Sequence, residues 1–223
     1  SPWSSYEEIH SLRLGIDFWV TYAERRAFPY EEYSIRHFPG ILDEDKLQIL
    51  QKIRHPNFVT VVDIFQFEEA THVVFEHMPI SLHDLSKISN RIDTIRLAAI
   101  LGQVVNGLVY LSDNGLEHGS LTCSNILVSR KGEVKIAGFE CCHSRVSEKN
   151  ENPDIRALKH IAAVLMGESV NRRETVSITD PYRWDFAAVD FVAVTTSATS
   201  VEELKKHPLL KLPWKQEQIK RLV

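Results

Sequence analysis

Residues 116–140, LEHGSLTCSNILVSRKGEVKIAGFE, contain the side chains best suited to chemistry. His118 and Ser120 offer an imidazole and a hydroxyl, the groups from which hydrolases build a base and its nucleophile. Residues two apart in a loop rarely meet in that geometry, so the spacing disfavours hydrolysis. Asn125 and Glu140 offer oxygen atoms of the kind that magnesium prefers. Asn125 alone is a poor magnesium site, and a loop glutamate is by default solvated.

The run Cys141-Cys142-His143 could suggest a metal site. Adjacent ligands lack the two-residue spacing of zinc sites, and the sequence has no second pair, so we expect no zinc here. Three cysteines are too few for a disulfide framework, and no N-x-S/T sequon is present. Both observations favour a reducing, intracellular setting, most simply the cytoplasm.

The composition is that of a folded domain: 223 residues, 43% apolar and 25% charged, with a net charge of −4. The sequence has no excess of Lys and Arg, so its charge disfavours a nucleic-acid partner. The start, Ser-Pro-Trp, has neither a signal-peptide pattern nor an initiating Met, which suggests a fragment of a longer protein. The longest uncharged run, from Leu97 past Tyr110, falls short of the roughly 20 residues of a membrane span and predicts a buried helix.

The hydrophobic pattern changes along the chain from strand-like to helical. Residues 9–38 alternate apolar and polar side chains and predict two or three antiparallel strands. Apolar residues recur at helical spacing in 42–54, with acidic residues in the first turn, and His55-Pro56 ends that helix. We further expect strands at 58–67 and 72–76, helices at 81–88, 93–111 and 154–167, and a short strand pair at 126–128 and 133–136. Segregated strands and helices predict an α+β fold.

The segment 116–140 resembles the catalytic and magnesium-binding loops of protein kinases, H-R-D-L-x-x-x-N followed by D-F-G. This chain has His118-Gly119-Ser120-Leu121 and Asn125, then Gly138-Phe139-Glu140. Six further segments resemble kinase elements in the same order: 46–57, 72–78, 81–85, 97–111, the helix that begins near Asp154, and 200–210. The resemblance implies the two-lobed kinase-like fold, with a small lobe over residues 1–78 and a large lobe over 79–223.

The same resemblance locates residues that depart from the kinase pattern. The glycine-rich loop should lie in 9–20, where only Gly15 is a glycine. Arg36 stands at the place of the β3 lysine, and Lys46 at that of its glutamate partner, so Arg36 should face Lys46 and be repelled. Ser120 replaces the catalytic aspartate and Gly138 the metal-binding aspartate. We expect no useful phosphoryl transfer and no metal site.

Structural positions of the pattern are retained. The hydrophobic column that joins kinase lobes maps to four residues with suitable side chains: Leu50, Val61, His118 and Phe139. We expect His118 to be a packed structural histidine, Asp154 to brace the loop around it, and Asn125 to bond the loop backbone. A nucleotide pocket, neither supported nor excluded, would be lined by Ser34, Arg36, Phe75, Glu76, Met78 and Leu127.

These features indicate a pseudokinase, similar to SCY1-like pseudokinases and to kinase-like predicted proteins of filamentous fungi. Such a domain would serve as a scaffold or regulator that binds other proteins, or other domains of its own polypeptide. Two alternatives stay open. One is an atypical kinase or nucleotidyl transferase that uses Arg36, Asn125 and Glu140. The other is a metal-independent switch that responds to nucleotide. The C-terminal segment, KLPWKQEQIKRLV, predicts a helix packed on the large lobe.

Overall fold

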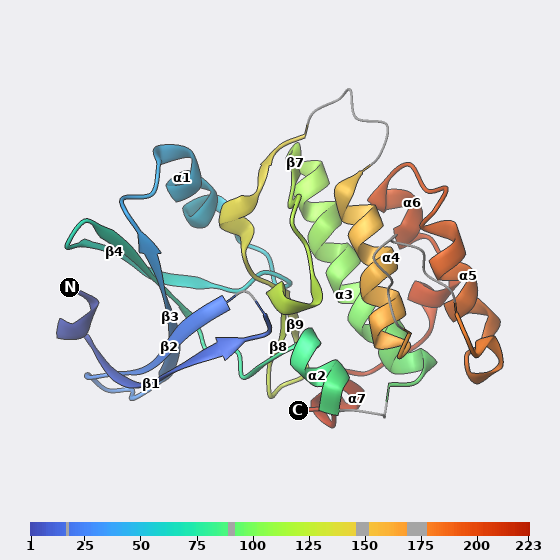
Figure 1. Cartoon of the computed structure of the whole chain (residues 1–223), viewed down its shortest axis with the longest axis horizontal. Helices are drawn as coiled ribbons and strands as arrows, with labels where there is room; N and C mark the ends of the chain where they lie inside the picture. Colours follow the sequence, from blue (N-terminus) through green and yellow to red (C-terminus); the bar gives the residue numbers. More distant parts are fainter. Residues whose placement is uncertain (17, 89–91, 146–151, 169–177) are drawn as a thin grey trace.

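The N-terminal part of the computed structural model is a five-stranded antiparallel sheet, with the strand order β1-β2-β3-β5-β4 (Figure 1). The structure describes residues 1–16, 18–88, 92–145, 152–168 and 178–223. The strands are β1 (Tyr6–Leu14), β2 (Phe18–Arg25), β3 (Glu32–Pro39), β4 (Val61–Phe67) and β5 (Ala70–Glu76). The alternating residues 9–38 thus form three strands, as the sequence allowed.

The two faces of this sheet pack against different surroundings, because successive side chains of a strand point to opposite faces. On one face, Tyr33 and Ile35 join a small buried cluster with Tyr6, Ala23 and Val74, next to the short turn η1 (Pro2–Ser4). On the other face, Ser34 and Arg36 line a cavity together with residues of the helical part. β3 therefore separates a local cluster from the cleft between the two parts of the molecule.

Helix α1 (Glu44–Lys52) lies beside the sheet and begins at an acidic cap. The Asp43 carboxylate accepts a hydrogen bond of 2.8 Å from the Lys46 backbone N–H, and Glu44 and Asp45 fill the first turn, where the helix dipole favours anions. Leu50 is its fully buried residue. The helix predicted for 42–54 is present with shorter ends.

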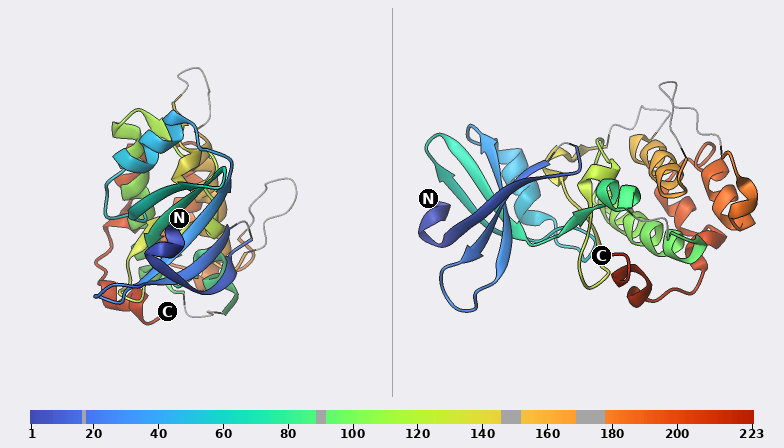
Figure 2. Two further views of the ribbon diagram at one scale, coloured as in Figure 1. Left: turned by 90° about the vertical axis from the view of Figure 1, so that its left-hand side faces the viewer. Right: turned by 60° about the horizontal axis from the view of Figure 1, so that its bottom comes forward.

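The remainder of the chain is mainly helical, as Figure 2 shows beside the sheet. Its helices are α2 (Leu82–Ile88), α3 (Thr94–Asp113), α4 (Pro153–Leu165), α5 (Phe186–Val194), α6 (Val201–Lys205) and α7 (Gln216–Lys220). Its short strands are β6 (Ile80–Ser81), β7 (Leu116–Glu117), β8 (Ile126–Val128), β9 (Val134–Ile136) and β10 (His143–Ser144). Its 3-10 turns are η2 (Cys123–Asn125), η3 (Phe139–Cys141), η4 (Pro181–Arg183) and η5 (Pro208–Lys211).

Helix α3 forms the centre of the helical part. It is long and apolar enough to cross a membrane by length and composition, but 72% of its most apolar stretch is buried inside the molecule, as in the core helix of a folded domain. The predicted buried helix at 93–111 and the predicted helix at 154–167 correspond to α3 and α4.

The sheet followed by helices confirms the predicted α+β, two-lobed kinase-like architecture. Residues 168–190 could not be interpreted from the sequence alone. Within that range, 169–177 lie outside the described residues, and 181–183 and 186–190 belong to η4 and α5. The division of the chain at residue 78 stays a prediction.

Candidate functional site

The loop that follows β7 is held by one buried carboxylate. The backbone N–H groups of His118 and Gly119 donate to the two oxygens of Asp154, over 2.8 and 2.9 Å. The His118 ring is fully buried, and its Nε2 lies 3.0 Å from the carbonyl oxygen of Ala137. Burial lowers the pKa of His118, so its imidazole is held neutral. His118 and Asp154 therefore occupy the packed and bracing positions that the sequence indicated.

The amide of Asn125 is engaged within the same loop. Its Nδ2 donates to the carbonyl oxygen of Ser120 over 2.8 Å, and its Oδ1 accepts from the Thr122 N–H over 2.8 Å. Both ends of the amide thus fix the loop backbone, as the sequence reasoning allowed. Ser120 itself is exposed to solvent. A metal ion at Asn125 would have to compete with these two hydrogen bonds.

The segment after β9 turns at Gly138 and buries Phe139. Gly138 has φ +76°, in the left-handed region that favours glycine, and carries no side-chain oxygen. The Phe139 ring packs edge-on against Phe58 and Phe75, with ring centroids 5.6 and 6.1 Å apart. Phe139 belongs to the main core together with Leu50 and Val61, two other members of the predicted hydrophobic column. With His118 also buried, the four predicted column positions lie in the interior.

Arg36 pairs with Glu140, not against Lys46 as the sequence predicted. The Arg36 guanidinium nitrogen lies 2.6 Å from Glu140 Oε1, and both side chains are largely buried, with 17% and 8% exposed. Lys46 is on the surface of α1, where its ammonium lies 3.1 Å from Asp43. The prediction was wrong because Glu140, 104 residues further along the chain, is brought beside β3 by the fold.

The place predicted for a nucleotide, between β3, β5 and β8, is almost filled by its own side chains. Five of the six predicted nucleotide-pocket residues line one cavity, whose volume is only about 20 Å³: Ser34, Arg36, Phe75, Glu76 and Leu127. Leu14, Val20, Val59 and Ala137 complete the lining. The sixth residue, Met78, does not line this cavity. It is fully buried, and its carbonyl oxygen accepts a hydrogen bond of 3.2 Å from the Tyr22 hydroxyl.

An ion pair also occupies the carboxylate at the end of β5. The Lys135 ammonium on β9 lies 2.7 and 2.8 Å from the two oxygens of Glu76. Glu76 Oε1 accepts a further hydrogen bond of 2.7 Å from the Thr60 N–H. Glu76 therefore joins the sheet to the helical part and has little capacity left for a ligand.

The tip of the β1–β2 hairpin is bonded to the helical part, a contact that the sequence reasoning missed. The Gly15 N–H donates to Asp84 over 2.8 Å, and the Ile16 N–H donates to the Ser124 hydroxyl over 3.1 Å. Partial burial acts to raise the pKa of Asp84, but hydrogen bonds from Ser81, Gly15 and His83 outweigh it and leave that pKa below its ordinary value. The signal available in the sequence was Gly15 itself, since a side chain there would meet Ser124 at 2.6 Å.

The side chains of the run Cys141-Cys142-His143 do not converge. Cys141 is exposed and Cys142 is buried, which raises the pKa of the Cys142 thiol. His143 Nε2 lies 2.8 Å from the buried Glu117 carboxylate. Among the described residues, no three His, Cys, Asp or Glu side chains are grouped so as to hold a metal ion.

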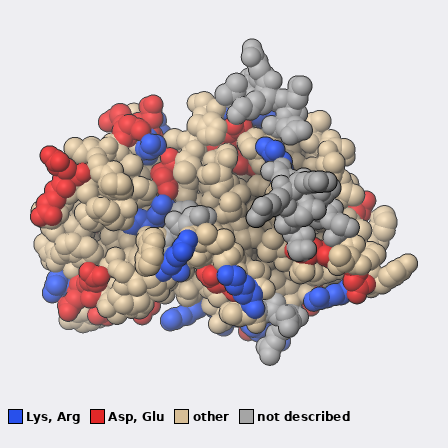
Figure 3. All heavy atoms as spheres, viewed as in Figure 1, with Lys and Arg blue, Asp and Glu red and all other residues tan. Residues whose placement is uncertain are grey.

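The surface carries charges of both signs. On the face drawn in Figure 3, Lys and Arg side chains lie interspersed with Asp and Glu. This mixture accords with the small net charge of −4.

Comparison with known proteins agrees with this architecture. The family described as "Protein kinase domain" matches residues 40–170. The TBC domain-containing protein kinase-like protein of Gallus gallus is 37% identical over 99 residues, which is 44% of this chain and 11% of that protein. The Homo sapiens protein of the same name is 36% identical over 99 residues, with the same two shares. The cytokinesis protein sepH of Emericella nidulans is 30% identical over 95 residues, 42% of this chain and 7% of that protein.

Proposed function

The chain belongs to the protein kinase domain family, and from that premise we propose that it is a catalytically inactive member, a pseudokinase, that serves as a protein-interaction scaffold. The observation that carries this proposal is the filled cleft. A cavity of about 20 Å³ accommodates roughly one water molecule. Pockets for small ligands are of the order of 300–1,000 Å³. The place predicted for a nucleotide therefore offers no room for one.

The residues around the cleft support the same proposal. Phosphoryl transfer needs a base for the substrate hydroxyl and carboxylates for magnesium, acting together. Ser120 offers a hydroxyl that does not titrate near neutral pH, and Gly138 offers no ligand atom. Glu140, the one carboxylate next to Gly138-Phe139, is paired with Arg36. The alternative enzyme would need Arg36, Asn125 and Glu140 for nucleotide and metal, yet each of them has a structural partner here.

The partners that we propose are other proteins or other domains of one polypeptide. The matched segment spans about a tenth of the length of the kinase-like relatives. The names of these relatives also mention a TBC domain. A small kinase-like domain within a longer polypeptide is suited to holding its neighbours in place. We propose an intracellular location, without a nucleic-acid partner or a membrane span, in keeping with the charge and the three free cysteines.

A thermal-shift titration with ATP, ADP and GTP, each with Mg²⁺ and with EDTA, tests the inactive site. A ligand at 100 times its dissociation constant that binds only the folded state should add about 2.7 kcal/mol to the free energy of unfolding, or several degrees of Tm for a domain of this size. We expect no shift at millimolar nucleotide. A Mg²⁺-dependent shift would contradict the proposal and favour the enzyme, whereas a shift that EDTA leaves unchanged would favour the nucleotide-responsive switch.

The scaffold role needs a separate test, with a protein partner as the readout. Deletion of this domain should abolish binding of the partner, whereas Ser120→Ala should leave that binding intact, because the Ser120 hydroxyl is exposed to solvent. Equal loss from Ser120→Ala and from the deletion would point to chemistry at the site and against a scaffold.

A further inference from the structure

Two histidines face each other on the sheet, away from the cleft. His37 on β3 and His72 on β5 are directly paired in the antiparallel ladder. His37 Nδ1 lies 3.2 Å from His72 Nε2. We propose that these two nitrogens form a binding site for a divalent transition metal ion of the Zn²⁺ or Cu²⁺ type. This inference is independent of the proposed scaffold function.

The separation of the two nitrogens fits a shared metal ion. Zinc bonds imidazole nitrogen at about 2.0–2.1 Å with tetrahedral angles, which places two nitrogen ligands about 3.3–3.4 Å apart. The observed 3.2 Å is therefore close to the distance that a bound ion would require. Directly opposed residues on antiparallel strands have Cβ atoms only about 5 Å apart, so the ladder itself holds both rings in place.

The surroundings of the pair leave the nitrogens available. His72 is 9% exposed, and its Nδ1 has no hydrogen-bond partner in the described part of the chain, so Nδ1 can carry the imidazole proton. The Nε2 lone pair of His72 then accepts the hydrogen bond from His37 Nδ1, and a metal ion would take the place of that proton, which His37 can carry on its other ring nitrogen. His37 is exposed, so an ion can enter from solvent and keep water at its other positions.

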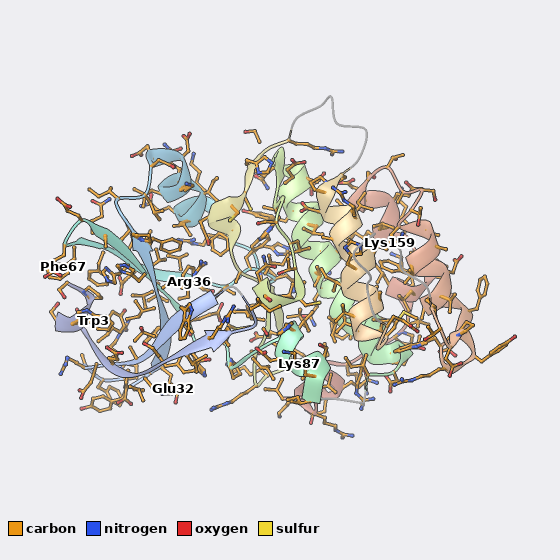
Figure 4. The ribbon with its side chains drawn as sticks, viewed as in Figure 1. Trp3, Glu32, Arg36, Phe67, Lys87 and Lys159 are labelled. Atoms are coloured by element: carbon orange, nitrogen blue, oxygen red, sulfur yellow. The ribbon has the colours of Figure 1, made fainter. Side chains whose placement is uncertain are left out.

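The pair lies at the outer end of the sheet. β3 side chains alternate, so His37 is on the face opposite to Arg36 and the cleft. The indole of Trp3, which Figure 4 labels at the end of the sheet far from the helices, is edge-on to His72 with ring centroids 6.2 Å apart. A bound ion would link β3 to β5 beneath this indole without touching the nucleotide cleft.

The first test is a Zn²⁺ titration of the whole chain, followed by thermal unfolding. The Tm should rise with Zn²⁺ concentration and saturate, and the rise should disappear in His37→Ala, which removes an exposed ligand and leaves the core intact. His10→Ala, an exposed histidine of β1, is the matched control and should keep the full rise. No Zn²⁺-dependent rise in the parent chain, or an equal rise in His37→Ala, would overturn the proposal.

A second measurement reports on the site directly. Cu²⁺ should bind more tightly than Zn²⁺ at the same nitrogens. It should also quench the fluorescence of Trp3, whose ring packs against His72. The quenching should be lost in His37→Ala and in Trp3→Phe, and a large excess of Zn²⁺ should reverse it in the parent chain. Quenching that survives in His37→Ala would place the copper elsewhere and overturn the assignment.

Discussion

At the scale of single residues, the Arg36–Glu140 pair is a structural link between the sheet and the helical part. Its side chains are largely buried, so each charge depends on the other to offset the loss of water. The guanidinium also lies 4.7 Å above the ring of Phe38. A flexible lysine in this place would have one ammonium to offer, whereas the planar fork of arginine can bond a carboxylate and stack on a ring at once.

Removal of one partner from this pair should be costly. Arg36→Met leaves Glu140 buried without its cation, and we expect a loss of about 3–5 kcal/mol in the free energy of unfolding. The double variant Arg36→Met/Glu140→Met should recover most of that loss, because no unpaired charge remains. Urea denaturation of Arg36→Met, Glu140→Met and the double variant gives the coupling between the two sites.

The matched control for this cycle is Arg26→Met, which breaks an ion pair with Glu7 on the surface. It should change the free energy of unfolding by about 1 kcal/mol or less. If Arg36→Met lowered the free energy of unfolding no more than Arg26→Met, the buried pair would contribute no more to stability than the exposed Arg26–Glu7 pair.

Sequence reasoning could anticipate local roles at this scale but not distant partners. Asp154 and Asn125 bond loop backbone as expected, because their positions in the motif imply short-range geometry. The partner of Arg36 was assigned wrongly, since it depends on how segments 104 residues apart meet. The His37–His72 pair also escaped notice, because it requires the exact register of two strands.

At the scale of elements, the tip of the β1–β2 hairpin is hydrogen-bonded to the helical part. Its backbone N–H groups at Gly15 and Ile16 are used for contacts with Asp84 and Ser124. In a kinase such a hairpin uses backbone N–H groups to approach phosphate. Here the same kind of donor is satisfied within the protein, which fits a cleft of about 20 Å³.

Gly15→Ala should release the tip of this hairpin. The glycine has φ +63°, and an added Cβ would lie 2.6 Å from the Cβ and 2.8 Å from the Cα of Ser124, so the tip must move away. Amide hydrogen exchange at Ile16 should accelerate, because its hydrogen bond to Ser124 would be lost.

Gly40→Ala serves as the control for this substitution. Gly40 also has a positive φ, +82°, but an added Cβ meets nothing within 4 Å. Both variants carry a backbone cost on the order of 1 kcal/mol, and only Gly15→Ala adds the collision. Unchanged exchange at Ile16 in Gly15→Ala would mean that the hairpin is not held by this contact.

The elements themselves were largely predictable from the sequence. Alternation predicted the strands of the sheet, and the acidic first turn predicted α1, since both are local patterns. The strand predicted for 58–67 begins only at Val61, because the Val59 N–H bonds the Ile136 carbonyl outside the sheet. The hairpin contact was missed, because Gly15 alone marks it in the sequence and the backbone donors leave no mark.

At the scale of the whole molecule, three polar links close the cleft between sheet and helices. They are Arg36 with Glu140, Glu76 with Lys135, and the hairpin tip with Asp84. Phe139 packs against Phe58 and Phe75 between them. A molecule linked in this way should present its outer surfaces in one fixed arrangement, a property that suits a scaffold.

One buried and one half-buried histidine, His118 and His77, should make the protein sensitive to mild acid. Burial lowers the pKa of both His118 and His77 from the ordinary 6.5, so the folded state keeps them neutral where the unfolded chain takes up protons. Their contribution is complete above pH 6.5 and is lost as the pH falls toward the folded-state values. Carboxylates with a lowered pKa, such as Asp84, also contribute to stability, and this contribution is lost only near pH 4 and below, where they become protonated.

The urea midpoint should therefore stay level from pH 7.5 to about 6.5 and fall from there to pH 5, and His77→Gln should flatten that fall because one half-buried imidazole is gone. His10→Gln, which removes an exposed imidazole of the same lobe, is the control for the loss of a histidine as such. A midpoint that stays constant over this range would contradict the prediction, since neutral burial of His118 and His77 requires the unfolded state to bind more protons as the pH falls.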